Sequence, residues 1–372
     1  MYSKIIQRIP ITRAGVVLVL VLVLVLAHAI VAISYTNASQ DIPDDNALKQ
    51  AKAQARGMAL AFHAASAKMM PSVVKVLATR EDVDPTLEEL DLLDKNSSKD
   101  YEIGSGVILS EDGLCVTNHH VISKAKGIVV YLPDGRKLVG NDVRSDKKSD
   151  IAIFQVRSPD PLPAATMGDS DALMIGDWVI AIGSPFSLDQ TVSVGIISSK
   201  GRSMSLLSGQ LLQTDAVINP GNSGGALLDI NGDLVGINTA IASTSGQFQG
   251  VGFAIPARRV QWIIKELISN GKVRRSLFGV QAFSIPQGIA SDLKISVRSG
   301  VYIGKVVTDG PAEKGGILVG DIVQAIGDQK VINPDDFKSI VEQLPADRSY
   351  SVKILRDGMP MTLDIQPITT KE

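Results

Sequence analysis

The feature that most constrains the fold of this chain is a series of short apolar runs between residues 71 and 256. The runs alternate with Gly, Asp, Asn and Ser, as in SGVILSEDGLCVTN, GIVVYLPDGRKLVG, DIAIFQV and DWVIAIGSPF. Runs this short, with closely spaced turn residues, favour a β-barrel or sandwich over βαβ units. The segments DGR (134–136) and NGD (231–233) predict hairpin turns. A proline-rich break, SPDPLP (158–163), divides the region into two β-rich halves.

A helix and a second globular unit follow this region. The segment PARRVQWIIKELISNGK has apolar residues at helical spacing and ends on Asn-Gly, which predicts a helix with a C-cap. After residue 276, strand-like runs surround a second predicted helix, NPDDFKSIVEQLP, with Asn333 as its N-cap. We expect four segments: a membrane anchor or signal segment (1–40), a helical spacer (41–70), a β-rich domain (71–270) and the second unit (277–368).

The N-terminal segment predicts export. Residues Ala14 to Ile33 form an apolar run that, as a helix, would be roughly 30 Å long, enough to cross a bilayer. Three positive charges precede it, Lys4, Arg8 and Arg13. By the positive-inside rule, the rest of the chain lies outside the cytoplasm. The alternative is a cleaved signal peptide processed at AHA (27–29), but the apolar run continues past this site and favours a retained anchor.

The composition excludes several function classes. Lys and Arg together number 37 against 39 Asp and Glu, the net charge is -2, and no basic stripe suited to nucleic acid is visible. The single cysteine, Cys115, excludes an internal disulfide and any multi-cysteine metal site. Its apolar setting, LCVTN, predicts a buried and inert thiol. We predict no metal or organic cofactor.

A candidate nucleophile lies in NPGNSGGAL (219–227). Ser223 is surrounded by glycines, which allow a tight turn whose backbone N–H groups converge on one point, as an oxyanion requires. The alternative is a glycine-rich hairpin turn with an idle serine. A second serine, Ser170 in GDSD, is followed by no glycines, and we expect it to be a surface loop residue.

A serine nucleophile needs an imidazole base and a carboxylate that orients it. The chain has four histidines, and His28 and His63 lie in the N-terminal segments, so the base must be His119 or His120 of TNHHVI. Asp150 comes directly before the apolar run IAIF and is the candidate carboxylate, although it could simply cap a turn.

The order histidine, aspartate, serine across two β-rich halves is that of chymotrypsin-like double barrels. Five blocks in order, TNHHVI, SDIAIFQV, GDSDALMIGDWVIAIGSPF, QTDAVINPGNSGGALLDINGDLVGINTAI and GVGFAIP, resemble the HtrA/Deg family of serine endopeptidases. The resemblance runs from about residue 71 to the C-terminus. It implies a mostly β chain, with a chymotrypsin-like double β-barrel followed by one PDZ domain and preceded by a transmembrane helix.

The resemblance also assigns roles to residues. The family pattern Thr-Asn-x-His-Val makes His120 the base and places His119 at the variable position, with Asp150 as the orienting acid and Ser223 as the nucleophile. The backbone N–H groups of Gly221, Asn222 and Ser223 would form the oxyanion hole. In GIISSKGR, Arg202 matches an arginine that switches this turn into order.

Substrate and ligand preferences follow from two further segments. Val217 stands six residues before the nucleophile, where trypsin-like enzymes carry an aspartate, so the pocket should prefer Val, Ala, Leu or Ile. The remaining expected pocket residues are Ile218, Ala240 and Ile241. The loop expected to bind a peptide carboxylate in the PDZ domain consists of Leu277, Phe278, Gly279 and Val280.

Taken together, these features predict an ATP-independent serine endopeptidase that cleaves unfolded or regulatory envelope proteins after small or aliphatic residues. Its substrates would be unfolded or membrane-associated proteins. The layout is similar to the membrane-anchored DegS-type branch, which implies a homotrimer held in the inner membrane with its catalytic domain in the periplasm. Hydrophobic C-termini would regulate it through the PDZ domain. The alternatives are a soluble periplasmic enzyme and, in another class, a catalytically silent chaperone-like or PDZ scaffold protein.

Overall fold

The computed structural model describes Val25 and residues 44–80, 101–184, 190–204, 207–241 and 248–370, with only the backbone for 202–204, 207–209, 240 and 241. The chain divides into two compact units, residues 1–60 and residues 61–372. The transmembrane helix predicted over Ala14–Ile33 lies, apart from Val25, outside the described residues. No helix within the described ranges is long and apolar enough to cross a membrane.

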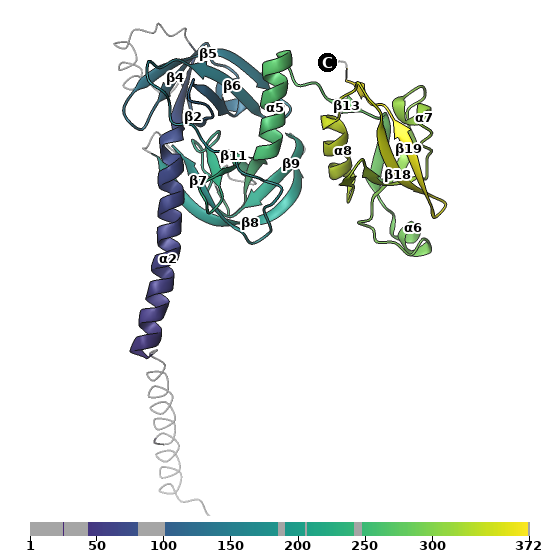
Figure 1. Cartoon of the computed structure of the whole chain (residues 1–372), viewed down its shortest axis with the longest axis horizontal. Coiled ribbons are helices and arrows are strands. Elements are labelled where there is room, and N and C mark those ends of the chain that lie inside the picture. Colours follow the sequence, from purple (N-terminus) through teal and green to yellow (C-terminus); the bar gives the residue numbers. More distant parts are fainter. Residues whose placement is uncertain are drawn as a thin grey trace, which may run out of the picture. The chain divides into compact units, whose positions relative to one another are not determined.

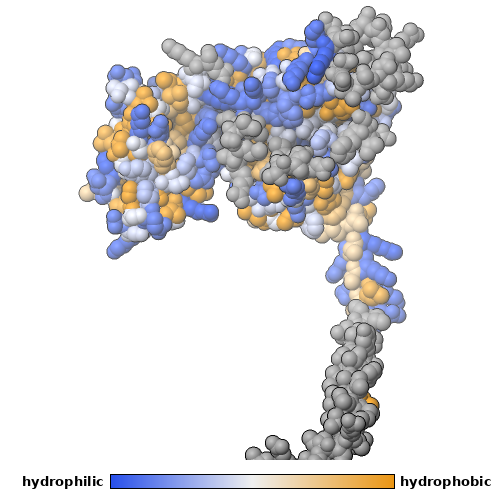
Figure 2. Space-filling view, turned by 180° about the vertical axis from the view of Figure 1, so that it is seen from behind, coloured by the Kyte–Doolittle hydropathy of each residue, from blue (hydrophilic) through white to orange (hydrophobic). Residues whose placement is uncertain are grey.

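The first long element is helix α2 (Asp45–Met69) (Figure 1). Hydrophilic side chains cover much of its exposed length in Figure 2. Its last turns pack onto the domain that follows: Ala65 and Met69 are buried in the core, and the ring of Phe62 meets the ring of Trp178 edge-on at 5.4 Å. A 3-10 turn, η1 (Met70–Ser72), then leads into the first strand.

The first half of the β-rich domain is a closed six-stranded barrel in the order β1-β2-β3-β6-β5-β4. Its strands are β1 (Val73–Thr79), β2 (Tyr101–Ile108), β3 (Leu114–Thr117), β4 (Gly127–Tyr131), β5 (Lys137–Asp146) and β6 (Ile151–Val156). One short helix, α4 (His119–Ile122), follows β3. The predicted turn at 134–136 joins the antiparallel strands β4 and β5, so that hairpin prediction is confirmed.

The second half is another closed six-stranded barrel, in the order β10-β11-β12-β9-β8-β7. Its strands are β7 (Trp178–Gly183), β8 (Thr191–Met204), β9 (Leu207–Thr214), β10 (Ala226–Leu228), β11 (Leu234–Ile241) and β12 (Gly252–Pro256). The proline-rich break at 158–163 lies between the two barrels, as predicted. Helix α5 (Ala257–Asn270) follows and ends at Gly271, whose left-handed conformation and N–H bond to Leu267 form the predicted C-cap.

One continuous core joins the two barrels and α5. Val107 and Val116 of the first barrel pack in the same cluster as Ile180 and Ile237 of the second. Apolar residues of α5 complete the cluster: Val260, Ile263, Ile264 and Leu267. Because this core is shared, the two barrels are fixed against each other, and a site can be built between them. The predicted double β-barrel is confirmed.

The C-terminal unit, which follows α5, contains a six-stranded antiparallel sheet in the order β14-β15-β16-β18-β19, with β17 paired to β16. A separate two-stranded sheet, β13-β20, and three helices complete it. Its strands are β13 (Ser276–Leu277), β14 (Val280–Ser284), β15 (Val301–Val306), β16 (Ile322–Ile326), β17 (Gln329–Lys330), β18 (Tyr350–Arg356), β19 (Met359–Ile365) and β20 (Ile368–Thr369). Its helices are α6 (Gln287–Asp292), α7 (Pro311–Lys314) and α8 (Pro334–Gln343). Asn333 caps α8 by accepting the Asp336 N–H at 2.9 Å, as predicted.

A buried ion pair connects the first barrel to the segment that enters this unit. Arg275 lies directly before β13 and donates to Asp146, at the end of β5, from Nη1 at 3.0 Å and from Nη2 at 2.6 Å. Both side chains are less than 10% exposed. Burial acts to raise the pKa of Asp146, but the hydrogen bonds and charge of Arg275, with help from Ser149, outweigh burial and lower it. The ionised form of this carboxylate therefore stabilises the folded state.

We predict that Arg275→Met lowers the free energy of unfolding by about 3 to 5 kcal/mol at pH 7, because it leaves Asp146 buried without its cation. The matched control is Arg274→Met, next in the chain, whose guanidinium is half exposed and pairs with Glu266. It should leave the free energy of unfolding close to the wild-type value, because an exposed pair contributes little. Urea unfolding measures both values, and equal losses would contradict the role given to the buried pair.

The pH dependence has a definite sign. The pKa of Asp146 is lowered in the folded protein, so its contribution to stability is present above the pKa of the unfolded state, about 3.9, and is lost as pH falls through that region. The difference between wild type and Arg275→Met should therefore shrink below about pH 4.

Candidate active site

The site is organised around the carboxylate of Asp150, which directly precedes β6 and is 5% exposed. Its Oδ1 accepts the backbone N–H of His120 at 2.9 Å, and its Oδ2 accepts His120 Nδ1 at 2.8 Å and the Thr239 hydroxyl at 2.6 Å. The backbone of Asp150 adopts a left-handed φ of 56°. Its carbonyl accepts from Asn118 Nδ2 and from the His119 N–H, which holds the turn in place. Asp150 therefore holds both the ring and the backbone of His120, which is more than a simple turn cap would do.

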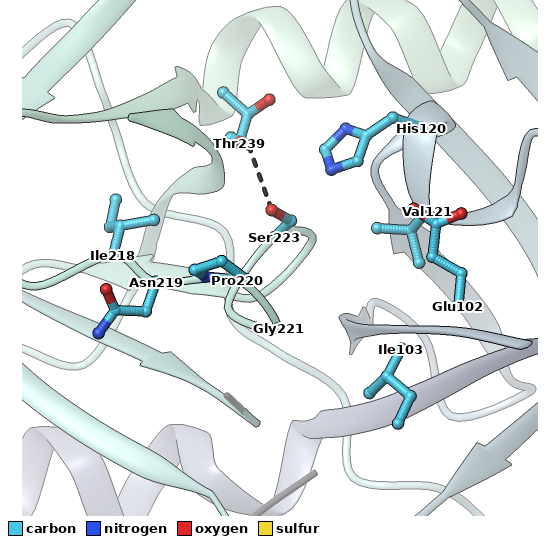
Figure 3. Close-up of a pocket in the computed structure, with 10 residues that line it drawn as sticks. All are labelled: Glu102, Ile103, His120, Val121, Ile218, Asn219, Pro220, Gly221, Ser223 and Thr239. Carbon is cyan, nitrogen blue, oxygen red and sulfur yellow. Dashed lines mark hydrogen bonds between the residues drawn. The ribbon is translucent and has the colours of Figure 1, made fainter. Parts of the chain in front are cut away.

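The two adjacent histidines point to different partners. His120 turns Nδ1 toward Asp150, which leaves Nε2 directed at the pocket that also contains Ser223 (Figure 3). His119 instead places Nδ1 3.0 Å from the Ser145 hydroxyl and is not among the pocket-lining residues. The structure thus brings His120, and not His119, together with the predicted acid and nucleophile.

The electrostatic setting of His120 favours its protonated form. Burial acts to lower the pKa of the imidazole, but the hydrogen bond and the negative charge of Asp150 raise it, and the charge of Glu102 adds to that effect. The net result is a pKa above the ordinary histidine value. A base with a raised pKa is stronger once it is neutral.

Ser223 and His120 face a pocket of about 310 Å³ between the two barrels. The lining residues are Glu102, Ile103, His120, Val121, Ile218, Asn219, Pro220, Gly221, Ser223 and Thr239 (Figure 3). In this structure the Ser223 hydroxyl donates to the carbonyl of Thr239 at 3.3 Å. The hydrogen-bond partner of this hydroxyl is thus Thr239 and not His120.

The turn around Ser223 supplies two donors to an anion, not three. The N–H of Asn222 donates to the carbonyl of Asn219 at 2.9 Å, so the prediction that Asn222 takes part in the oxyanion hole is corrected. Among the described residues, the N–H groups of Gly221 and Ser223 donate to no other group. Gly221 reaches this geometry with a φ of 100°, which glycine adopts readily.

Ser105 of β2 fixes this turn from the opposite barrel. Its hydroxyl donates to the carbonyl of Gly221 at 2.6 Å, and its N–H donates to the carbonyl of Ser223 at 2.8 Å. It is fully buried and also accepts the N–H of Ser184. A Cβ at Gly224 would lie 2.1 Å from the carbonyl oxygen of Ser105, so only glycine fits after the nucleophile.

Sequence reasoning missed Ser105 and Thr239. The available signal was weak: each is a small hydroxyl residue inside a strand, Ser105 in GSGVI and Thr239 in INTAI. It also misplaced Ser170, which was expected on the surface. That residue is 1% exposed, and its hydroxyl accepts the N–H of Arg258, the second residue of α5.

The predicted specificity residues lie in different places. Ile218 lines the pocket, whereas Val217 is 40% exposed and does not line it. The side chains of Ala240 and Ile241 are outside the described atoms, as is that of Arg202, whose backbone pairs with Leu211 between β8 and β9.

The predicted peptide-binding loop begins the C-terminal unit. Leu277 belongs to β13, Phe278 is 1% exposed against Phe337 of α8, and Val280 starts β14. Between them, Gly279 has a φ of 78°. β14 is an edge strand of its sheet, so a further strand could pair with its free edge.

Cys115 is fully buried in the first barrel, and burial raises the pKa of its thiol to about 12. A thiol with such a pKa is not a nucleophile near neutral pH. The prediction of an inert cysteine is confirmed.

We predict that the pKa of His120, followed by NMR titration of its ring, lies above the ordinary value of about 6.5. Asp150→Asn removes the negative charge while burial remains, so the pKa should fall below the wild-type value. The resonance is assigned by its loss in His120→Ala. An unchanged pKa in Asp150→Asn would show that this carboxylate does not control the imidazole.

Two segments match known domain families: residues 104–237 match the trypsin-like peptidase domain, and residues 286–366 match the PDZ domain. The probable periplasmic serine endoprotease DegP-like of Marinomonas sp. (strain MWYL1) is 42% identical over 264 residues, covering 71% of this chain and 56% of the relative. The periplasmic serine endoprotease DegP of Escherichia coli (strain K12) is 38% identical over 267 residues, with the same two coverages. This chain therefore spans little more than half the length of these relatives.

Solved structures give a match along nearly their full length. The HtrA-type protease AlgW with a tripeptide is 35% identical and has a TM-score of 0.68, covering 84% of this chain and 98% of that chain. The serine endoprotease from Yersinia pestis is 32% identical with a TM-score of 0.56, covering 83% of this chain and 98% of that chain. Sequence blocks, double barrel, PDZ domain and these similarities agree, and the chain belongs to the HtrA family of serine proteases.

Proposed function

We propose that this chain is an ATP-independent serine endopeptidase in which His120, Asp150 and Ser223 form the catalytic triad. The observation that carries the proposal is the pair of bonds from Asp150 to His120, which fixes the ring so that Nε2 faces the pocket of Ser223. The alternative, a catalytically silent chaperone-like or scaffold protein, would have no need for a buried carboxylate that accepts three bonds at this point.

The mechanism follows from the geometry. His120 Nε2 takes the proton of the Ser223 hydroxyl as Oγ attacks the carbonyl carbon of the substrate, and Asp150 stabilises the imidazolium that forms. The N–H groups of Gly221 and Ser223 stabilise the oxyanion. His120 then protonates the leaving amine, the peptide C–N bond breaks, and water hydrolyses the acyl-enzyme by the same steps in reverse.

The pocket wall on the Gly221 side favours small or aliphatic side chains before the cleaved bond. Ile218 lines this wall with Asn219, Pro220 and Gly221, and none of the four carries a carboxylate, so a cationic side chain would find no charge partner there. We infer cleavage after Val, Ala, Leu or Ile.

The setting of the enzyme is inferred from the N-terminus and from the relatives. The apolar run Ala14–Ile33 with its preceding positive charges supports a single inner-membrane anchor, with the catalytic domain in the periplasm. The similar proteins DegP and DegP-like are named periplasmic serine endoproteases, which agrees with that compartment. The family resemblance supports a homotrimer and unfolded or membrane-associated envelope proteins as substrates.

We further infer that the PDZ domain regulates the protease. An extended C-terminus could pair with the free edge of β14, with its carboxylate held by the loop Leu277–Val280. Arg202, near the hairpin between β8 and β9, is the proposed contact that passes the bound state to the turn before Ser223. A ligand changes activity by no more than its differential affinity for the two states, commonly about 1 to 3 kcal/mol.

The triad is tested by digestion of an unfolded protein such as reduced casein. Ser223→Ala and His120→Ala should abolish cleavage while the fold is retained, and His119→Ala should keep substantial activity as the matched control. Cleavage sites read by mass spectrometry should follow Val, Ala, Leu or Ile. Full activity in Ser223→Ala would refute the triad, and a majority of cuts after Lys or Arg would refute the assigned pocket.

Regulation is tested with a peptide that ends in hydrophobic residues and with the same peptide amidated at its C-terminus. The free acid should raise cleavage by roughly five- to 150-fold, the amide should not, and Arg202→Ala should blunt the response. Equal activation by the amide would exclude carboxylate capture as the switch. A rate that is unchanged by the peptide and by removal of residues 277–372 would exclude PDZ control altogether.

A further inference from the structure

A carboxylate outside the triad lies in the active-site pocket. Glu102 of β2 lines it, and it is the single carboxylate among the ten lining residues. Its side chain is exposed to solvent. Within the described residues it has no ion-pair partner. Its backbone is held in the ladder opposite Ala78 of β1, so the carboxylate starts from a fixed point of the barrel.

The two walls of the pocket can be assigned to the two halves of a bound substrate. Figure 3 shows Ile218, Asn219 and Pro220 on one side of Ser223, and His120, Val121, Glu102 and Ile103 on the other. His120 must give its proton to the leaving amine, so the substrate chain after the cleaved bond lies on the His120 side. The residue before the cleaved bond then faces Ile218. Glu102 therefore lies beside the part of the substrate that leaves first.

The negative charge of Glu102 acts on His120 in the same pocket. It is the smallest of the causes that raise the pKa of His120, after the hydrogen bond and the charge of Asp150. Beside it the wall is neutral and apolar, formed by Ile103 and Val121. A cationic side chain in this region would meet a carboxylate that forms no ion pair with the described part of the chain, and an acidic side chain would be repelled.

We propose that Glu102 is a specificity-determining residue that favours lysine or arginine within the first two residues after the cleaved bond. The inference rests on the proposed function, because it takes the direction of the substrate from the role of His120. It gives the site opposite preferences on its two sides: aliphatic before the cleaved bond and cationic after it.

The test uses internally quenched peptides with valine before the cleaved bond and Lys, Gln or Glu directly after it, and a second set varied one residue further on. Wild type should cleave the Lys peptide of at least one set about fivefold faster in kcat/KM than the Gln peptide, the upper range for a solvent-exposed ion pair. The preference should weaken at high salt, because ions screen an exposed pair.

Two variants and a matched control isolate the carboxylate. Glu102→Gln should bring the Lys-to-Gln ratio close to one, and Glu102→Lys should make the Glu peptide the better substrate. Glu111→Gln removes an exposed carboxylate from the loop between β2 and β3, outside the pocket, and should keep the wild-type ratio. Cleavage of all peptides at equal rates by wild type, or a Lys preference that survives in Glu102→Gln, overturns the role of Glu102 alone. If wild type cleaves neither casein nor any of the peptides, the proposed function is wrong, and the specificity proposed for Glu102 is wrong as well.

Discussion

The active site depends on one buried carboxylate. Asp150 belongs to the first barrel, yet one of its three donors, Thr239, lies on β11 of the second barrel. Burial of an ionised carboxylate is costly unless its oxygens are hydrogen-bonded, and here the donors that satisfy it are His120 and Thr239. The arrangement that makes the carboxylate tolerable is therefore the same one that orients the base. The site is therefore complete only when the two barrels are docked.

A second link between the barrels runs in the opposite direction. Ser105 of β2 binds the carbonyls of Gly221 and Ser223, the same two residues whose N–H groups would hold an oxyanion. Each barrel thus fixes a functional turn of the other: the second barrel completes the setting of Asp150, and the first completes the setting of Ser223. The shared apolar core, with Val107 and Ile180 in one cluster, keeps both links in register.

What the sequence could predict is what local chemistry decides. The hairpin at 134–136, the αL cap at Gly271 and the N-cap at Asn333 each depend on residues a few positions apart, and each prediction is confirmed. The choice between His119 and His120 could not be made from their spacing, because adjacent residues face different directions and only the tertiary structure shows which one meets Asp150. A family pattern was needed to choose His120.

The misses share a physical cause. The hydroxyl of Ser105 binds a carbonyl 116 residues away, and the hydroxyl of Thr239 binds a carboxylate 89 residues away. In a single sequence both look like ordinary strand residues. The N–H of Asn222 was assigned to the wrong role because a turn can be predicted from Gly and Asn, whereas the particular N–H that closes it cannot.

The two carboxylates near His120 have the same sign of charge but different consequences, because their exposure differs. Asp150 is 5% exposed and fully bonded, so its effect on the imidazole is built into the fold. Glu102 is open to solvent, so its effect depends on what lies beside it. Both raise the pKa of His120, against the opposing effect of burial. The higher pKa makes the neutral imidazole a stronger base but reduces the fraction of the imidazole that is neutral.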